Sequence, residues 1–95
     1  MSKGCYVYAI VDRDTPLPER SIESGATELV MVAWRRLAAV IRWMAIDDAP
    51  RRMADVLHHE TIVESLRKQG RTLPVRFGTV FRDTTSLAAA IAERY

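Results

Sequence analysis

The sequence has few of the features that reveal a location or a chemistry at once. Cys5 is its single cysteine, which excludes a disulfide within the chain and is typical of a reducing cytoplasm. Its place in an apolar run predicts a small buried side chain. No stretch reaches the ~18 consecutive apolar residues of a membrane span, and the first residues lack the features of a secretory signal. We therefore expect a cytoplasmic protein with no membrane partner.

The net charge and the placement of the glycines also indicate no ligand. The formal net charge is only +2, and basic residues are interleaved with acidic ones, so no basic stripe for nucleic acid emerges. The four glycines are scattered and form no phosphate-binding loop. Ser65, Thr79 and Ser86 lack the glycine context of a nucleophile elbow. We expect no nucleic-acid partner, no bound cofactor and no catalytic residue.

One cluster of metal-ligating side chains needs separate treatment, namely His58, His59 and Glu60. Adjacent histidines on a helix point about 100° apart, so both cannot face one metal ion. The four-residue spacing of a helical zinc site is absent, and no cysteine lies nearby to complete the coordination. We therefore expect no metal site, and we expect His59 to be a core histidine whose hydrogen bonds are satisfied.

Three apolar runs rich in β-branched residues predict strands. Cys5–Val11 is a continuous apolar run, which is typical of a strand covered on both faces. Leu29–Trp34 and Leu37–Met44 are separated only by two arginines, which predicts a tight hairpin although no Gly or Asn marks the turn. Asp12–Ala26 contains prolines, serines and a glycine and is expected to form a long loop.

A helix is expected after these strands. Asp47-Asp48-Ala49-Pro50 provides capping and first-turn residues, and Gly70 is well placed to end the helix, so we place it at about Arg51–Gln69. Its periodicity turns His59 toward the core stripe and leaves His58 nearer solvent. The other members of the expected core stripe are Val56, Ile62, Val63 and Leu66.

The most informative segment combines an apolar strand pattern with three residues that strands disfavour. It reads Leu73-Pro74-Val75-Arg76-Phe77-Gly78-Thr79-Val80-Phe81. Proline lacks a ladder donor, glycine weakens a strand unless the backbone bends or is closely approached, and a buried arginine needs a partner. Regular alternation would place one set of side chains on one face, namely Leu73, Val75, Phe77, Thr79 and Phe81.

Arg76 and Gly78 carry the two specific expectations for this segment. Arg76 would meet Glu60 or Glu64 of the preceding helix in an ion pair that locks helix to strand, or would reach solvent from a sheet edge. Gly78 would mark a point of close approach.

The order of elements predicts the fold class. Asp83 is a natural cap for a last helix, which presents Leu87, Ala88, Ile91 and Tyr95 on one face. The chain then reads strand, long loop, strand, strand, helix, strand, helix. This order predicts a single α+β domain over residues 1–95, a modified ferredoxin-like sandwich. It would have a four-stranded, largely antiparallel sheet and two helices, with a loop in place of the first crossover helix.

The chain resembles the N-terminal domain of the gas vesicle accessory proteins F and L (GvpF/GvpL). Three segments carry the resemblance: Tyr6–Val11, the helix with His59-Glu60 and Val63-Glu64, and Leu73–Phe81, which is the most specific. It implies a structural motif made of His59, Glu60, Leu73, Pro74, Arg76, Phe77, Gly78, Thr79 and Phe81. The second α+β domain of the family is not expected within these 95 residues.

The resemblance implies a non-enzymatic protein of gas vesicle assembly or a minor vesicle component. Its expected partners are the hydrophobic shell protein and other accessory proteins, and its expected location is the cytoplasm and the gas vesicle. An alternative remains open: a small ferredoxin-like domain that forms a homodimer and binds a metabolite. A closed apolar pocket with convergent polar groups would favour that alternative, whereas an open apolar face or an unpaired sheet edge would favour protein binding.

Overall fold

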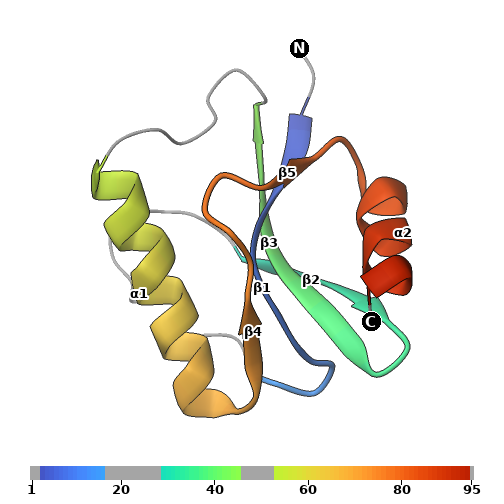
Figure 1. Cartoon of the computed structure of the whole chain (residues 1–95), viewed down its shortest axis with the longest axis horizontal. Helices are drawn as coiled ribbons and strands as arrows, with labels where there is room; N and C mark the ends of the chain where they lie inside the picture. Colours follow the sequence, from blue (N-terminus) through green and yellow to red (C-terminus); the bar gives the residue numbers. More distant parts are fainter. Residues whose placement is uncertain (1–2, 17–28, 46–52, 95) are drawn as a thin grey trace.

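One antiparallel sheet with a helix on either side forms the described part of the chain, residues 3–16, 29–45 and 53–94 of the computed structural model (Figure 1). Its elements are β1 (Lys3–Asp12), β2 (Val30–Trp34), β3 (Leu37–Ala45), α1 (Met53–Gln69), β4 (Thr72–Pro74), β5 (Val80–Phe81) and α2 (Thr84–Arg94). The strand order is β2-β3-β1-β4, and β5 also pairs with β1. This confirms the α+β class and is consistent with a ferredoxin-like sandwich. The predicted helix start at 47–50 and most of the predicted long loop lie outside the described residues.

The central strand β1 is covered on both faces, as its continuous apolar run predicts. Every residue from Gly4 to Val11 is buried. β1 pairs with β3 along its length, but the register shifts between Val7 and Ala9, so Tyr8 is an extra residue in the ladder. Such a bulge changes the alternation of side chains. Tyr8 and Ala9 consequently both pack in the apolar cluster beneath α1.

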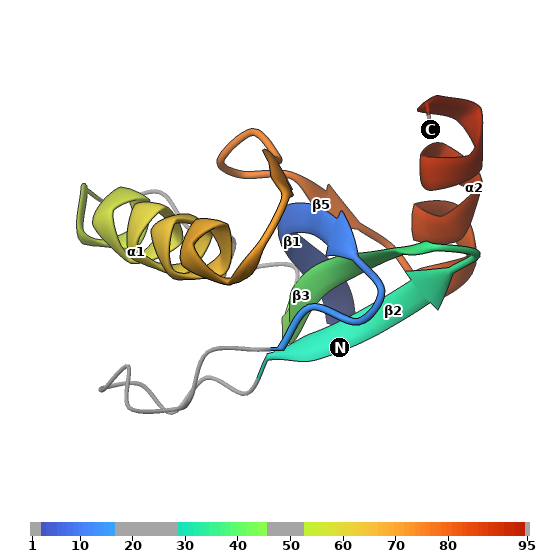
Figure 2. The same cartoon turned by 90° about the horizontal axis from the view of Figure 1, so that it is seen from below.

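The sheet separates two apolar layers, and each helix closes one of them (Figure 2). On the α1 side, Ile62 and Leu66 pack against the sheet, while Leu87 and Ile91 of α2 pack on the other side. Burial of each such side chain stabilises the fold by about 1.5–3 kcal/mol. His59, Ile62, Val63 and Leu66 are buried as the helical stripe predicts, and Val56 is half-buried.

The last helix also buries the predicted face in part: Leu87 and Ile91 are buried and Ala88 is half-buried, whereas Tyr95 lies outside the described residues. α2 begins at the predicted cap. The Asp83 carboxylate accepts a hydrogen bond from the Ser86 backbone N–H at 2.8 Å, and this bond lowers the pKa of Asp83. Of the helices described, none has the length and apolar character that crossing a membrane requires.

The predicted hairpin of β2 and β3 forms without a glycine because arginine contacts hold its turn. Arg35 has a positive φ of 58°, a conformation that L residues rarely adopt. Its guanidinium lies 4.7 Å from the centroid of the Trp34 ring. Arg13 donates to the turn twice, from its backbone to the Arg36 carbonyl (2.8 Å) and from its side chain to the Arg35 carbonyl (3.2 Å).

The predicted strand Leu73–Phe81 is instead two short strands with a turn between them. β4 and β5 both pair with β1, and residues 75–79 leave the ladder. The Thr79 N–H bonds to the Arg76 carbonyl at 3.2 Å, and Gly78 has φ +90°. A four-residue turn with positive φ at its third residue is a type II turn, which favours glycine at that position. The break explains why the side chains do not alternate: Phe77 packs on the α1 side, and Val75 and Phe81 pack on the α2 side.

Each of the three disfavoured residues in this segment has a separate explanation. Pro74 lies in the edge strand β4, where a missing donor is tolerated. Arg76 is exposed, and among the described residues it forms no ion pair with Glu60 or Glu64, so the predicted lock is wrong. A Cβ added at Gly78 would meet nothing within 4 Å. Gly78 is therefore required by its backbone conformation and not by close approach.

Gly78→Ala should lower the free energy of unfolding by about 1–2 kcal/mol, because a side chain disfavours the positive φ of the turn. Gly70→Ala is the matched control, since its Cβ would meet only Thr15 Oγ1 at 3.9 Å and its φ lies outside the positive region. The control should change stability by less than about 0.5 kcal/mol. Urea denaturation of both variants measures the difference, and equal effects would contradict this reading of the turn.

Candidate functional site

His59 lies where α1, β1 and the 75–79 turn meet, and its side chain is only 2% exposed. Its Nε2 is 3.0 Å from the Val75 carbonyl oxygen, and its Nδ1 is 2.7 Å from the Tyr6 hydroxyl. A carbonyl oxygen only accepts, so Nε2 carries the proton and Nδ1 accepts the hydrogen bond of the Tyr6 O–H. Both ring nitrogens of His59 are thus used in contacts with other elements.

Tyr6 extends this network to the glycine of the turn. The Gly78 backbone N–H donates to the Tyr6 hydroxyl at 3.4 Å, so one hydroxyl joins β1 to both α1 and the turn. The rings of Tyr6, Phe77 and His59 pack edge to face, with centroids 5.6–6.3 Å apart. Burial raises the pKa of Tyr6 and lowers the pKa of His59, which keeps both side chains neutral near pH 7.

Other residues of the predicted motif lie apart from this network. Glu60 is exposed on α1, and Leu73 is 46% exposed on β4. Thr79 donates its hydroxyl to the Arg76 carbonyl at 2.7 Å, which closes the turn. Sequence reasoning missed Tyr6 as a partner of His59, because the two residues are 53 positions apart and the apolar run around Tyr6 indicates only a core strand.

A second polar group lies beside the network, on the same side of the sheet. The Tyr8 hydroxyl, Arg42 Nε and His58 Nε2 are buried and have no hydrogen-bond partner among the residues that the structure describes. The ring centroids of Tyr8 and His58 are 6.0 Å apart, and the Arg42 guanidinium carbon lies 5.4 Å from the Tyr6 ring centroid. Burial raises the pKa of Tyr8 to about 12 and lowers the pKa of His58.

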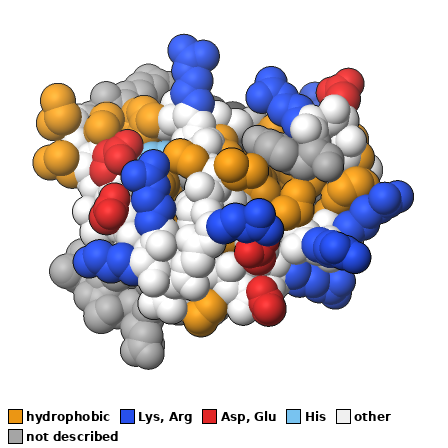
Figure 3. Space-filling model, turned by 60° about the horizontal axis from the view of Figure 1, so that its bottom comes forward, with side chains coloured by type: hydrophobic (Ala, Val, Ile, Leu, Met, Phe, Trp, Pro, Cys, Tyr) orange, Lys and Arg blue, Asp and Glu red, His pale blue; other side chains and the backbone are white. Residues whose placement is uncertain are grey.

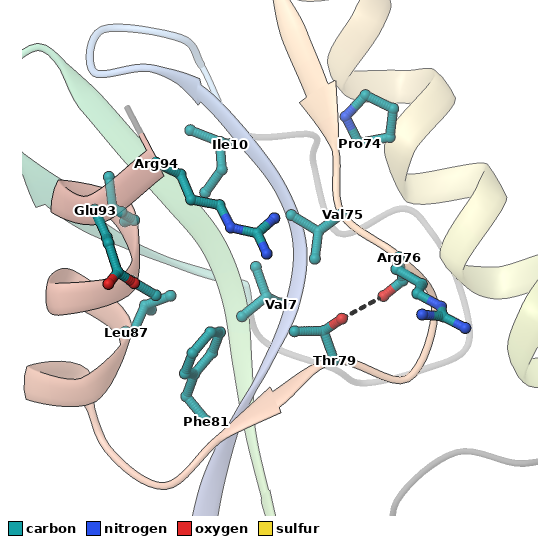
Figure 4. Close-up of a pocket in the computed structure, with 12 residues that line it drawn as sticks. Val7, Ile10, Pro74, Val75, Arg76, Thr79, Phe81, Leu87, Glu93 and Arg94 are labelled. Atoms are coloured by element: carbon teal, nitrogen blue, oxygen red, sulfur yellow. Dashed lines mark hydrogen bonds between the residues drawn. The ribbon is translucent and has the colours of Figure 1, made fainter.

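An open groove lies on the other side of the sheet, between α2 and the β4–β5 segment (Figure 4). Its volume is about 520 Å³. Its apolar lining comes from β1, the interrupted edge and α2, and comprises Val7, Ile10, Pro74, Val75, Phe81, Leu87, Ala90 and Ile91. Thr79 and the charged residues Arg76, Glu93 and Arg94 complete it. The described residues thus offer this hollow to a partner.

The His59 network supports one wall of the groove from behind without lining it. Its hydrogen bond holds the Val75 carbonyl on the α1 side, while the Val75 side chain lines the groove on the α2 side. The flanking backbone is held by bonds from the Val75 N–H to the Tyr8 carbonyl and from the Val7 N–H to the Thr79 carbonyl, each 3.1 Å. The groove wall is therefore built from an ordered turn.

Neither site has the grouping expected of a metal centre. Within residues 3–16, 29–45 and 53–94, no three His, Cys, Asp or Glu side chains are placed to hold a metal ion together. Burial also raises the pKa of the Cys5 thiol, which is unsuited to a reactive thiolate. What the geometry offers is an ordered surface with both apolar and polar lining for non-covalent contacts.

Comparison with known proteins gives one family. The family model described as "Gas vesicle synthesis protein GvpL/GvpF" matches residues 4–95. No curated protein and no solved structure matches the chain. The match includes the His59 network, the interrupted edge and the groove.

Tyr6→Phe should lower the free energy of unfolding by about 1–3 kcal/mol, because it leaves His59 Nδ1 buried without a donor. Tyr8→Phe is the matched control on the same strand, because the Tyr8 hydroxyl has no partner to lose. It should leave stability unchanged or raise it slightly. Denaturant unfolding measures the free energy of unfolding of both variants. A larger loss of stability for Tyr8→Phe than for Tyr6→Phe would contradict the proposed network.

Stability should also fall in mild acid. The pKa values of His58 and His59 are lowered in the fold, so the unfolded chain takes up protons first as the pH drops below about 6.5. The stability that depends on the neutral rings is complete above that pH and is lost as the pH falls toward the folded-state pKa values. The slope is at most about 1.4 kcal/mol per pH unit for each histidine.

NMR titration of the two imidazole rings checks this pH dependence. In the folded chain both rings should titrate with midpoints at lower pH than in the denatured chain. In the His58→Gln variant only the His59 signal remains, which assigns the two signals. A His59 midpoint above the denatured value would be incompatible with the buried neutral ring.

Proposed function

This chain belongs to the gas vesicle synthesis family GvpL/GvpF, and we propose that it acts in gas vesicle assembly by binding the hydrophobic shell protein in the groove beside α2. Family membership supports the assembly role. The shell protein and other accessory proteins are the proposed partners, and the cytoplasm and the gas vesicle are the proposed location. A shell subunit must expose apolar surface in order to polymerise around gas, so before assembly it needs a protein that covers this surface.

The observation that carries the proposal is the open groove with its apolar lining. Val7, Ile10, Leu87 and Ile91 are almost completely buried and form its floor, while Val75 and Phe81 are half-buried beside them. Because the groove is bounded by a helix and an interrupted sheet edge, it can take a segment of another chain between them (Figure 4). The predicted motif then has an architectural role, since it forms one wall of this groove.

We assign no catalytic role to the chain. The family is a gas vesicle synthesis family and not an enzyme family. His59, the most buried titratable base in the network, uses both ring nitrogens in hydrogen bonds that hold the fold. Among the described residues its two partners are a carbonyl oxygen and the Tyr6 hydroxyl, and burial raises the pKa of Tyr6, which opposes formation of a nucleophilic phenolate.

The volume of the groove keeps one alternative open, a domain that binds a small metabolite. About 520 Å³ falls within the range of about 300–1,000 Å³ that is typical of small-molecule sites. Those sites enclose most of the ligand, however, whereas this groove is only partly enclosed. Saturable binding of a small carboxylate, together with no binding of shell protein, would favour the metabolite.

Ala90→Lys should abolish retention of purified shell protein by the immobilised chain, because Ala90 lines the groove and lysine adds bulk and a charge there. Ala89→Lys is the matched control: Ala89 is exposed on the same helix and does not line the groove. The wild type and the control should retain the shell protein alike. Absence of retention by the wild type would sink the proposed function, and equal retention by Ala90→Lys would exclude the groove as the contact.

A further inference from the structure

Two arginines line the groove, Arg76 and Arg94, and neither forms an ion pair within the described part of the chain. Arg94, in the last turn of α2, lines the groove and forms no ion pair with any described residue. Figure 4 shows its side chain reaching from α2 across the apolar floor toward Val75. Glu93 is also a lining residue, but it leaves α2 at the adjacent position, and its carboxylate is not bonded to Arg94.

An arginine above an apolar floor selects a particular kind of occupant. A segment that lays apolar side chains on the floor would bring one of its polar side chains under the guanidinium, and a carboxylate is the group that guanidinium binds best. A lysine or arginine in that place would instead be repelled. On the face shown in Figure 3, apolar side chains are bordered by Lys and Arg side chains and, at several places, by Asp and Glu.

We propose that the groove takes an amphipathic segment of a protein partner whose apolar side chains are accompanied by a carboxylate that pairs with Arg94. This rests on the proposed function and specifies the chemistry of the partner segment. The apolar lining that is still accessible, Pro74, Val75, Phe81 and Ala90, provides most of the affinity. Arg94 provides selectivity for acidic over basic segments. The segment is held between α2 and the turn that the His59 network fixes.

The test uses two fluorescein-labelled amphipathic peptides with identical apolar residues, one with glutamate and one with lysine at the polar positions. Fluorescence anisotropy should show that the wild-type chain binds the acidic peptide more tightly, about three- to tenfold. The preference should shrink as salt is raised from about 50 to about 500 mM. Equal binding of the two peptides, or no binding of either, would overturn the proposal.

Arg94→Glu and Lys68→Glu form a matched pair of variants. Each reverses one basic charge in the last turn of a helix, but Lys68 lies on α1, away from the groove. Arg94→Glu should remove or reverse the preference for the acidic peptide, and Lys68→Glu should leave it within about twofold of the wild type. If Lys68→Glu has the same effect as Arg94→Glu, the selectivity comes from net charge and the proposal fails.

The failures of this inference and of the proposed function can be told apart. Shell protein retained by the chain together with equal binding of the two peptides would reject the acidic segment and leave the assembly role intact. Selective binding of the acidic peptide together with no retention of shell protein would reject that partner and leave the chemistry of the groove intact. Circular dichroism of each variant confirms that it is folded.

Discussion

The neutral ring of His59 is the constraint on which the rest of the structure depends. It accepts from the Tyr6 hydroxyl and donates to the Val75 carbonyl, and so connects the central strand, the long helix and the turn of the interrupted edge. These polar atoms lie among aromatic rings, where an unpaired donor or acceptor is costly. The network therefore stabilises one relative position of the three segments. Apolar packing alone is less directional and would define this position less precisely.

The hydrogen bonds of His59 also fix part of the surface where binding is proposed, on the other side of the sheet. The 75–79 turn has two faces: Phe77 packs toward His59, and the Val75 side chain lines the groove on the α2 side. Because the Val75 carbonyl is held from behind, the groove wall is ordered before any partner arrives. Preorganisation of this kind lowers the cost of binding. In this account the hydrogen bonds of His59 do not touch the partner; they hold the turn whose other side lines the groove.

Local pattern predicted most of the secondary structure, and long-range contacts account for what it missed. The apolar run of β1, the stripe of α1 and the cap at Asp83 each depend on residues close in sequence, and each is found in the fold. The break at 75–79 depends on partners of the turn in β1 and α1, which periodicity does not contain. The site was predictable only in part: burial of His59 followed from the helical stripe, but its bond to Tyr6 spans 53 positions. Of the two expectations for Arg76, the ion pair to the helix does not form and the arginine is exposed.

The protonation state of the His59 ring tests the central claim most directly, because the whole network assigns the proton to one nitrogen. Long-range proton–nitrogen NMR spectra of the imidazole, recorded on the folded chain at about pH 7.5 and assigned with His58→Gln, distinguish the two neutral tautomers from the charged ring. The account predicts a neutral ring with the proton on Nε2 and a non-protonated Nδ1 that accepts from Tyr6. A ring protonated on Nδ1, or charged at this pH, would contradict it.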